Sequence, residues 1–242
     1  MDFFIRKYKQ LYNLLGKSPN HDLTKRPLCN FLKSRTEIKE CRRILYRNGF
    51  KSHVHKCKDW DLASIIPAID DGNFLDMGSS DSSILKNISI LRISGELHGI
   101  DLREPIKPVR QVKYIVGDLM DTKLPDNYFK NITCLSVIEH EVDFKKLAQE
   151  VSRLLQLGGK IFLTFDYWDP KIKTDMTLYG LKWQPLDKQA VNMLIAEFES
   201  HDLYPVEDID WALGEPVIDR DYYSPDPNVS YTFGLLTFEK RQ

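Results

Sequence analysis

Three aspartates lie at the ends of short apolar segments in the middle of the chain: Asp76, Asp101 and Asp118. A carboxylate accepts several hydrogen bonds, and the hydroxyls of a ribose are donors of the matching kind. Gly78 follows Asp76 by two positions and can take a positive φ, which lets a ligand approach bare backbone. The spacing of these residues therefore predicts a crevice that binds a nucleoside-like ligand.

These aspartates need a parallel sheet to bring them together. From residue 73 onward, short apolar runs alternate with segments of helical periodicity, which is the pattern of parallel α/β proteins. Strands are predicted at residues 73–77, 96–102, 112–116, 132–137, 160–166, 204–211 and 230–239. Helices are predicted between them at residues 80–90, 143–157 and 186–199. Because ligands bind beyond the carboxyl ends of such strands, we expect the three acids to line one edge of the sheet.

The connections at this edge carry signals of their own. The small polar residues 79–82 can cap the following helix, and the backbone N–H groups of this turn are expected to be free for a ligand. Two prolines within residues 102–111 predict a connection with at most a turn or two of helix. Gly158 and Gly159 predict the C-cap of the helix over residues 143–157.

The first 60 residues differ from the rest of the chain in charge. They hold 15 Lys and Arg against five Asp and Glu, although the whole chain has a net charge of −1. Apolar periodicity predicts helices at residues 3–15, from Pro27, from Thr36 to Asn48, and at residues 60–69. The chain is therefore divided into a basic helical N-terminal extension, residues 1–59, and a second domain, residues 60–242. The extension could bind nucleic acid, form a homodimer contact or dock on the acidic domain, and we favour docking over nucleic acid.

Several other classes are not indicated. No apolar run is long enough to span a membrane, and the N-terminus shows no signal-peptide pattern. The four cysteines form no CxxC pair, which predicts reduced thiols in a cytoplasmic protein. His53, His55 and Cys57 alternate, but no fourth ligand accompanies them, so no metal site is expected.

The run Asp76-Met77-Gly78 resembles the first motif of class I S-adenosylmethionine-dependent methyltransferases, Asp/Glu-x-Gly-x-Gly-x-Gly, without its later glycines. Serines replace the second and third glycines of Gly-x-Gly-x-x-Gly, which argues against a nicotinamide dinucleotide. Residues 124–129 and 134–143 are similar to the corresponding stretch of the small-molecule methyltransferases of this family. The resemblance covers residues 60–242. It implies a Rossmann-like three-layer α/β/α sandwich, with a seven-stranded, mostly parallel sheet of order 3-2-1-4-5-7-6 and an antiparallel last strand.

The resemblance also implies S-adenosyl-L-methionine as the cofactor. In this family an acid after the third strand bonds the adenine amino group, which assigns this role to Asp118 and a backbone contact to Leu119. The residues predicted to bind the cofactor are Asp76, Met77, Gly78, Ser79, Ser80, Asp101, Leu102, Asp118, Leu119 and Ser136.

His140 is the predicted general base for methyl transfer, because an imidazole titrates near neutral pH and this one follows the fourth strand. Glu139 and Glu141 could orient it or hold a substrate amine. Alternatively, the Glu-His pair only caps the next helix or lines the cofactor site. A pocket for the acceptor is predicted from the aromatic residues Tyr167, Trp168, Tyr179, Trp183, Tyr222 and Tyr223.

The sequence therefore favours an enzyme that methylates a small-molecule acceptor, at a hydroxyl of a metabolite or sugar intermediate. One alternative is an RNA methyltransferase that uses the basic N-terminal helices. The other is a non-catalytic methyltransferase-like binding subunit, which the missing glycines of the first motif would suit.

Overall fold

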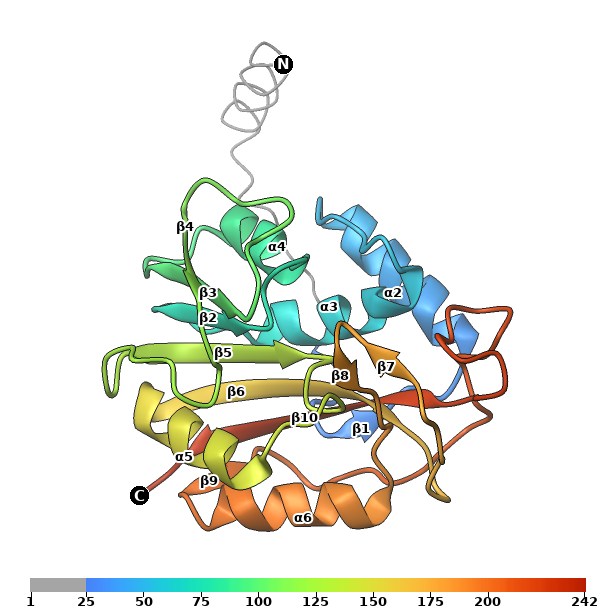
Figure 1. Ribbon diagram of the computed structural model, residues 1–242. Helices are drawn as coiled ribbons and strands as arrows, with labels where there is room; N and C mark the ends of the chain where they lie inside the picture. The colour runs from blue at the N-terminus through green and yellow to red at the C-terminus, as the bar shows by residue number, and fades with distance from the viewer. Residues whose placement is uncertain (1–24) are drawn as a thin grey trace.

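The computed structural model describes residues 25–242. One large sheet runs through the molecule, with helices on both of its faces (Figure 1). Its strands are β1 (Asn30–Phe31), β2 (Phe74–Met77), β3 (Leu97–Asp101), β4 (Val112–Val116), β5 (Phe129–Leu135), β6 (Leu155–Tyr167), β9 (Leu203–Pro205) and β10 (Thr232–Lys240). A separate hairpin consists of β7 (Thr177–Leu178) and β8 (Leu181–Lys182).

The helices form two layers, one on each side of the sheet (Figure 1). One layer holds α5 (Phe144–Leu154) and α6 (Lys188–Glu199), and the other holds α2 (Arg35–Arg47), α3 (Asp59–Ile65) and α4 (Ile84–Leu91). The short 3-10 helices η1 (Lys56–Lys58) and η2 (Ile66–Ala68) flank α3. A separate hydrophobic core fills each interface between helices and sheet. The predicted three-layer α/β/α sandwich is confirmed. Among the described helices, none is long and apolar enough to cross a membrane.

The order of the sheet is β1-β10-β6-β5-β2-β3-β4, with β9 paired to β10. The strands from β4 to β6 pair in parallel, and β10 runs antiparallel to β6. If β1 is left aside, the strands β2, β3, β4, β5, β6, β9 and β10 are the first to the seventh in chain order. Numbered in this way, the sheet has the predicted order 3-2-1-4-5-7-6, and its last strand in the chain is antiparallel to β6, as predicted. The carboxyl ends of β2, β3 and β4 therefore lie at the same edge of the sheet.

The helix predicted from Pro27 is wrong, because Asn30 and Phe31 form β1 against β10. Phe31 is fully buried there, with its ring centroid 4.2 Å from that of Tyr167. Helix α2 starts only after Ser34, whose hydroxyl accepts a hydrogen bond from the Glu37 N–H, and it ends at Asn48 as predicted. The described part of the N-terminal extension thus belongs to the sheet and its core. The helix predicted at residues 3–15, and any dimer contact through it, lie outside the described residues.

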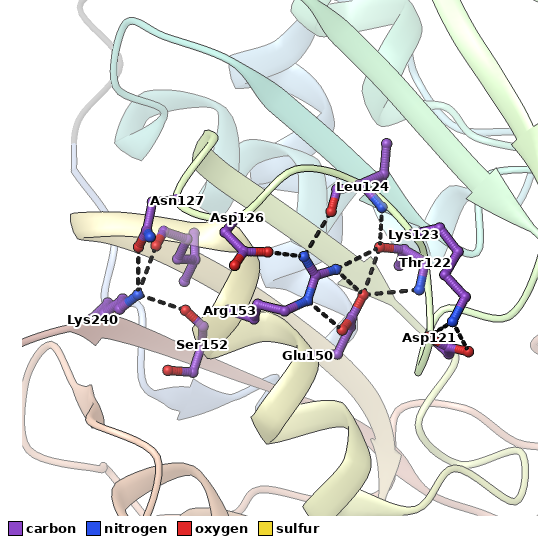
Figure 2. Close-up of polar contacts among 11 residues, drawn as sticks. Asp121, Thr122, Lys123, Leu124, Asp126, Asn127, Glu150, Ser152, Arg153 and Lys240 are labelled. Carbon is purple, nitrogen blue, oxygen red and sulfur yellow. Dashed lines mark hydrogen bonds and ion pairs between the residues drawn. The ribbon is translucent and has the colours of Figure 1, made fainter.

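The helix predicted over residues 143–157 ends earlier, at Leu154, and Gly158 and Gly159 lie inside β6 rather than at a helix C-cap. Gly158 has a φ of +69°, and a Cβ on Gly159 would lie 2.9 Å from the Gln156 carbonyl oxygen. The glycines therefore allow a tight turn of the chain from α5 into β6, at the point where the register of the β5–β6 pairing shifts. The Lys240 ammonium instead donates hydrogen bonds to carbonyls at the end of α5 (Figure 2). The distances are 2.6 Å to the Ser152 carbonyl oxygen and 3.0 Å to that of Leu155.

The loop before β5 is fastened to α5 by a polar network around Arg153 (Figure 2). The Arg153 guanidinium donates to Glu150 at 2.7 Å and to the Leu124 carbonyl at 2.7 Å, and it also pairs with Asp126. Glu150 in turn accepts from the Thr122 N–H at 2.8 Å. This network holds the start of β5, whose far end carries the residues discussed below.

Candidate functional site

Asp76 is buried inside β2 near the carboxyl edge of the sheet. Its carboxylate accepts a 2.6 Å hydrogen bond from the Thr133 hydroxyl of the neighbouring strand β5. Burial raises the pKa of Asp76 to about 6, against the lowering effect of hydrogen bonds from Ser82 and Thr133. The strand thus presents a carboxyl poised to titrate close to neutral pH.

Gly78 makes the turn after β2 possible. Its φ is +84°, and a Cβ at this position would lie 2.3 Å from the Cγ2 of Val137, the residue that follows Ser136 after β5. The turn therefore needs glycine both for its backbone conformation and for its close approach to the β5 loop.

The N–H groups of this turn are not free, contrary to the expectation from the sequence. Those of Gly78 and Ser79 donate to the Ile100 carbonyl at 2.8 and 3.1 Å, and that of Ser80 donates to Asp101 at 3.0 Å. The helix also starts later than predicted, at Ile84. The amides of this turn therefore tie β2 to β3.

Asp101 ends β3 and faces the same turn. Its carboxylate accepts one hydrogen bond from the Ser80 N–H and another from the Arg103 N–H, each at 3.0 Å. Each carboxylate oxygen can accept more than one bond, so acceptor capacity for a ribose remains. The charge of Asp101 also contributes to the raised pKa of Asp76, which puts the two carboxyls within electrostatic reach of one another. Leu102, next in the chain, is 59% exposed.

Asp118 follows β4 and is exposed to solvent. Its carboxylate accepts a 2.8 Å hydrogen bond from the Met120 N–H in its own turn, and Leu119 beside it is nearly buried. The structure thus gathers Asp76, Asp101 and the glycine turn closely, and it puts Asp118 at the next strand end without a contact to them among the described interactions. The connection from β3 to β4 forms no helix at all.

A cavity opens between this turn and the segment before β2. It is lined by His53, Lys58, Asp61, Leu62, Asp76, Gly78, Asp81, Ser82, Ser83, Ile84 and Leu135. Within residues 25–242, no group of three or more His, Cys, Asp or Glu side chains is arranged to hold a metal ion. The pKa of His53 is lowered to about 4, first by burial and then by the charge of Lys58.

The residues after β5 form the other side of the site. Ser136 has a φ of +54° and its N–H donates to the Thr164 carbonyl at 2.8 Å, so the chain turns sharply there. Glu139 is 2% exposed, and neither of its carboxyl oxygens has a hydrogen-bond partner. Burial raises the pKa of Glu139 well above its usual range, and the charge of Asp166 adds to this effect.

His140 is half-buried, and its Nδ1 is buried without a hydrogen-bond partner. Burial, followed by the charge of Lys58, lowers the pKa of His140 to about 4, so the imidazole is neutral at pH 7. No hydrogen bond joins it to Glu139. Its ring instead meets Tyr179 edge-on, at the tip of the β7–β8 hairpin, with 6.0 Å between ring centroids.

The aromatic residues predicted to form a pocket are divided between core and surface. Tyr167 and Trp183 are buried completely within the two hydrophobic cores, whereas Tyr179 is 74% exposed. The Arg103 guanidinium lies 4.6 Å from the centre of the Tyr179 ring. The hairpin tip therefore spans from the Asp101 side of the site to the His140 side.

Three charged residues beside the site were not predicted from the sequence: Lys58, Asp61 and Asp166. Two of them precede the first strand of the resembled domain, where no motif marks them. The third lies at the end of β6, two positions after Thr164 and on the same face of the strand, and its position after an apolar run was a signal that could have found it.

Residues 75–163 match a family model described as a methyltransferase domain. Among solved structures, the chain resembles the YcgJ protein from Bacillus subtilis, with 18% identity and a TM-score of 0.54 over 75% of this chain and 98% of that one. It also resembles a geranyl diphosphate C-methyltransferase from Streptomyces coelicolor, with 11% identity and a TM-score of 0.54 over 91% and 95% of the two chains.

A third similar structure is phosphoethanolamine N-methyltransferase 2 from Haemonchus contortus in complex with S-adenosyl-L-methionine. The identity is 13% and the TM-score 0.52, over 75% of this chain and 52% of that one. At these identities the likeness concerns the fold. No curated protein sequence matches the chain.

Proposed function

We propose that this chain is a class I S-adenosylmethionine-dependent methyltransferase and that it transfers the methyl group to a hydroxyl of a small-molecule acceptor; the methyltransferase-domain match over residues 75–163 and the shared fold support this. The observation that carries the proposal is the edge where β2, β3 and β5 end. There the Gly78 turn, tied to Asp101 through Ser80, approaches Val137, and the chain continues from Val137 to Glu139 and His140, whose carboxyl oxygens and Nδ1 have no hydrogen-bond partner.

The residues at this edge suit the cofactor. Asp101 keeps acceptor capacity for ribose hydroxyls, and Gly78 keeps the turn free of a side chain. Asp118 and Leu119 are assigned to the adenine. The remaining assigned residues are Asp76, Met77, Ser79, Ser80, Leu102 and Ser136. When bound, S-adenosylmethionine supplies a methyl group already activated by its sulfonium, so the protein's tasks are alignment and proton handling.

His140 takes the proton of the acceptor hydroxyl in this proposal. The imidazole is neutral at pH 7 because its pKa is lowered to about 4, and its unpartnered Nδ1 can accept a proton. The weak basicity of such an imidazole suits an acceptor whose proton leaves as the new bond forms. The Tyr179 ring contacts the imidazole edge-on from the hairpin side.

Binding of the product S-adenosylhomocysteine tests the cofactor assignment. The full chain is heated with this compound and with NAD, and a ligand at 100 times its Kd raises the stability by ~2.7 kcal/mol. We expect a shift with S-adenosylhomocysteine alone, a weaker shift for Asp101→Asn, and an unchanged shift for Asp208→Asn, which removes an exposed acid elsewhere. A shift with NAD but none with S-adenosylhomocysteine would refute the assignment.

The acceptor is tested by methyl transfer from labelled cofactor to fractionated small metabolites and RNA. The proposal expects label in a small molecule, and a rate for His140→Ala lower by about 10²–10⁴-fold with cofactor affinity retained. Label in RNA would favour the alternative that uses the basic N-terminal residues. A chain that binds the cofactor and labels nothing would favour the non-catalytic alternative.

A further inference from the structure

A buried cluster of charges lies where η1, α3, β5 and β6 meet, next to the proposed reaction site. It contains the carboxyls of Asp61, Glu139 and Asp166, residues that are 1%, 2% and 6% exposed. A single ammonium, that of Lys58, interacts with all three charges and lies 3.7 Å from the nearer oxygen of Asp61. The ring of Phe233 faces the same ammonium, with 3.6 Å between Nζ and the ring centre. Acidic and aromatic groups around a cation are the composition of an ammonium-binding cage.

Part of this cage lacks hydrogen-bond donors. Asp166 accepts a 2.7 Å bond from the Trp183 indole, and one Asp61 oxygen accepts a 3.1 Å bond from the Thr164 hydroxyl. The other Asp61 oxygen and both Glu139 oxygens are buried with no partner. A buried acceptor without a donor carries a desolvation cost, which a ligand with N–H groups would remove.

The balance of charge in the cage points in the same direction. Three carboxyls face one ammonium, and the pKa values of Asp61, Asp166 and Glu139 are all raised, first by burial. Burial lowers the pKa of Lys58, but Asp61 and Asp166 more than offset this, so the lysine stays charged. The cage therefore stabilises a cation at this position, and the same carboxyls would stabilise an ammonium that replaces that of Lys58.

The cage lies beside the proposed reaction site. Lys58 and Asp61 line the same cavity as Asp76 and Gly78, and the Lys58 ammonium is hydrogen-bonded to Ser136. The Lys58 side chain is 18% exposed and stands on the three-residue helix η1. Its flexible stem can therefore withdraw toward solvent and leave the cage to another ammonium.

We infer that this cage is the acceptor subsite, that it holds a protonated amino group of the acceptor in the place of the Lys58 ammonium, and that the substrate is an amino alcohol. The inference rests on the proposed function, since the hydroxyl of the same molecule receives the methyl group. The Lys58 side chain keeps the carboxyls neutralised until the acceptor replaces it.

Small probes of different charge test this inference on the full chain saturated with S-adenosylhomocysteine. The probes are 2-aminoethanol, ethylene glycol and glycolate at equal concentration and matched ionic strength, and the measurement is the shift of the thermal unfolding midpoint. We expect a shift with 2-aminoethanol and none with the neutral or the anionic probe.

Variants locate the binding. Glu139→Gln keeps the shape of the side chain but cannot ionise beside an ammonium, and it is expected to weaken 2-aminoethanol binding about tenfold or more, the loss of one charged hydrogen bond. Asp61→Asn removes another carboxylate of the cage and is expected to weaken 2-aminoethanol binding in the same way. Glu215→Gln, which alters an exposed acid elsewhere in the described chain, is the matched control and should bind as the parent does. Lys58→Ala is expected to bind 2-aminoethanol more tightly, because the internal competitor is gone.

Three results would overturn the inference. Binding of glycolate that is lost in Lys58→Ala would mean that Lys58 itself holds an anionic acceptor group. Equal shifts with all three probes, or none with any, while S-adenosylhomocysteine still stabilises the chain, would reject the amino-group subsite alone. Absence of any shift with S-adenosylhomocysteine would instead reject the proposed function, and the acceptor assignment with it.

Discussion

The close approach of the Gly78 turn to Val137 can be tested by a double-mutant cycle. Alanine at position 78 must adopt a φ near +84° and place its Cβ 2.3 Å from the Val137 Cγ2, where the two groups would overlap. The left-handed backbone costs an L-residue about 1–2 kcal/mol. The overlap adds about 1–3 kcal/mol, as overpacking of a filled site does. Gly78→Ala should therefore lower the free energy of unfolding by roughly 2–5 kcal/mol.

Val137→Ala removes the methyl groups that the new Cβ would meet, at a cost of about 1–2 kcal/mol for the lost burial. In the Val137→Ala background, Gly78→Ala should cost only the free energy of the left-handed backbone. The double variant should therefore be more stable than the sum of the two single effects predicts, by roughly 1–3 kcal/mol. Urea unfolding of the parent, the two single variants and the double variant gives the coupling energy. Titration with S-adenosylhomocysteine should show weaker binding for Gly78→Ala and partial recovery in the double variant.

Additive effects of the two substitutions within about 0.5 kcal/mol would refute this reasoning. The turn would then yield without meeting Val137, and its glycine would be needed for its φ alone. A cost of Gly78→Ala below about 1 kcal/mol would refute the backbone argument as well.

Two further predictions concern a titrating carboxyl and a structural network. The pKa of Asp76 rises from 3.8 to about 6 on folding, so the native state holds this proton more tightly and its stability falls as pH rises from about 4 to 6. Relative to the parent, Asp76→Asn should therefore gain roughly 3 kcal/mol between pH 4 and pH 7 in denaturant unfolding, and a difference independent of pH would contradict this. Arg153→Ala leaves Glu150 nearly buried without its ion pair and should cost about 1–3 kcal/mol. Arg153→Lys should recover only part of this, since it cannot bond Glu150 and the Leu124 carbonyl together, whereas the exposed Lys145→Ala should cost almost nothing. Equal stability of Arg153→Ala and Lys145→Ala would show that the network in Figure 2 is not stabilising.

The local pattern of the chain was enough to predict most of the strands, and the resemblance to a known family supplied their order. Val112–Val116 has the predicted bounds, and Phe74–Met77 differs from the prediction by one residue, because each is a short apolar run bounded by polar or turn residues. The alternation of strands with helices then leaves few ways to build a parallel sheet, and the resemblance to a known family selected one of them. The acids that end the strands were predictable for the same reason.

Elements whose conformation depends on distant partners were not predictable in this way. Asn30 and Phe31 form a strand only because the edge of β10 is open to them, more than 200 positions later in the chain. Gly158 and Gly159 look like a helix end in sequence, but the pairing of β5 with β6 draws them into a strand. The free amides expected after Gly78 are used by Ile100, a residue of the neighbouring strand.

The sequence by itself determined the central strands of the sheet, the acids that end them and the place of its glycine turn. Only the tertiary structure decided that Lys58, from the segment before the first strand of the resembled domain, lies among Asp61, Glu139 and Asp166. The reason is physical. The central strands follow from neighbours along the chain, whereas a buried charge is decided by the groups that surround it, and these come from three separate segments.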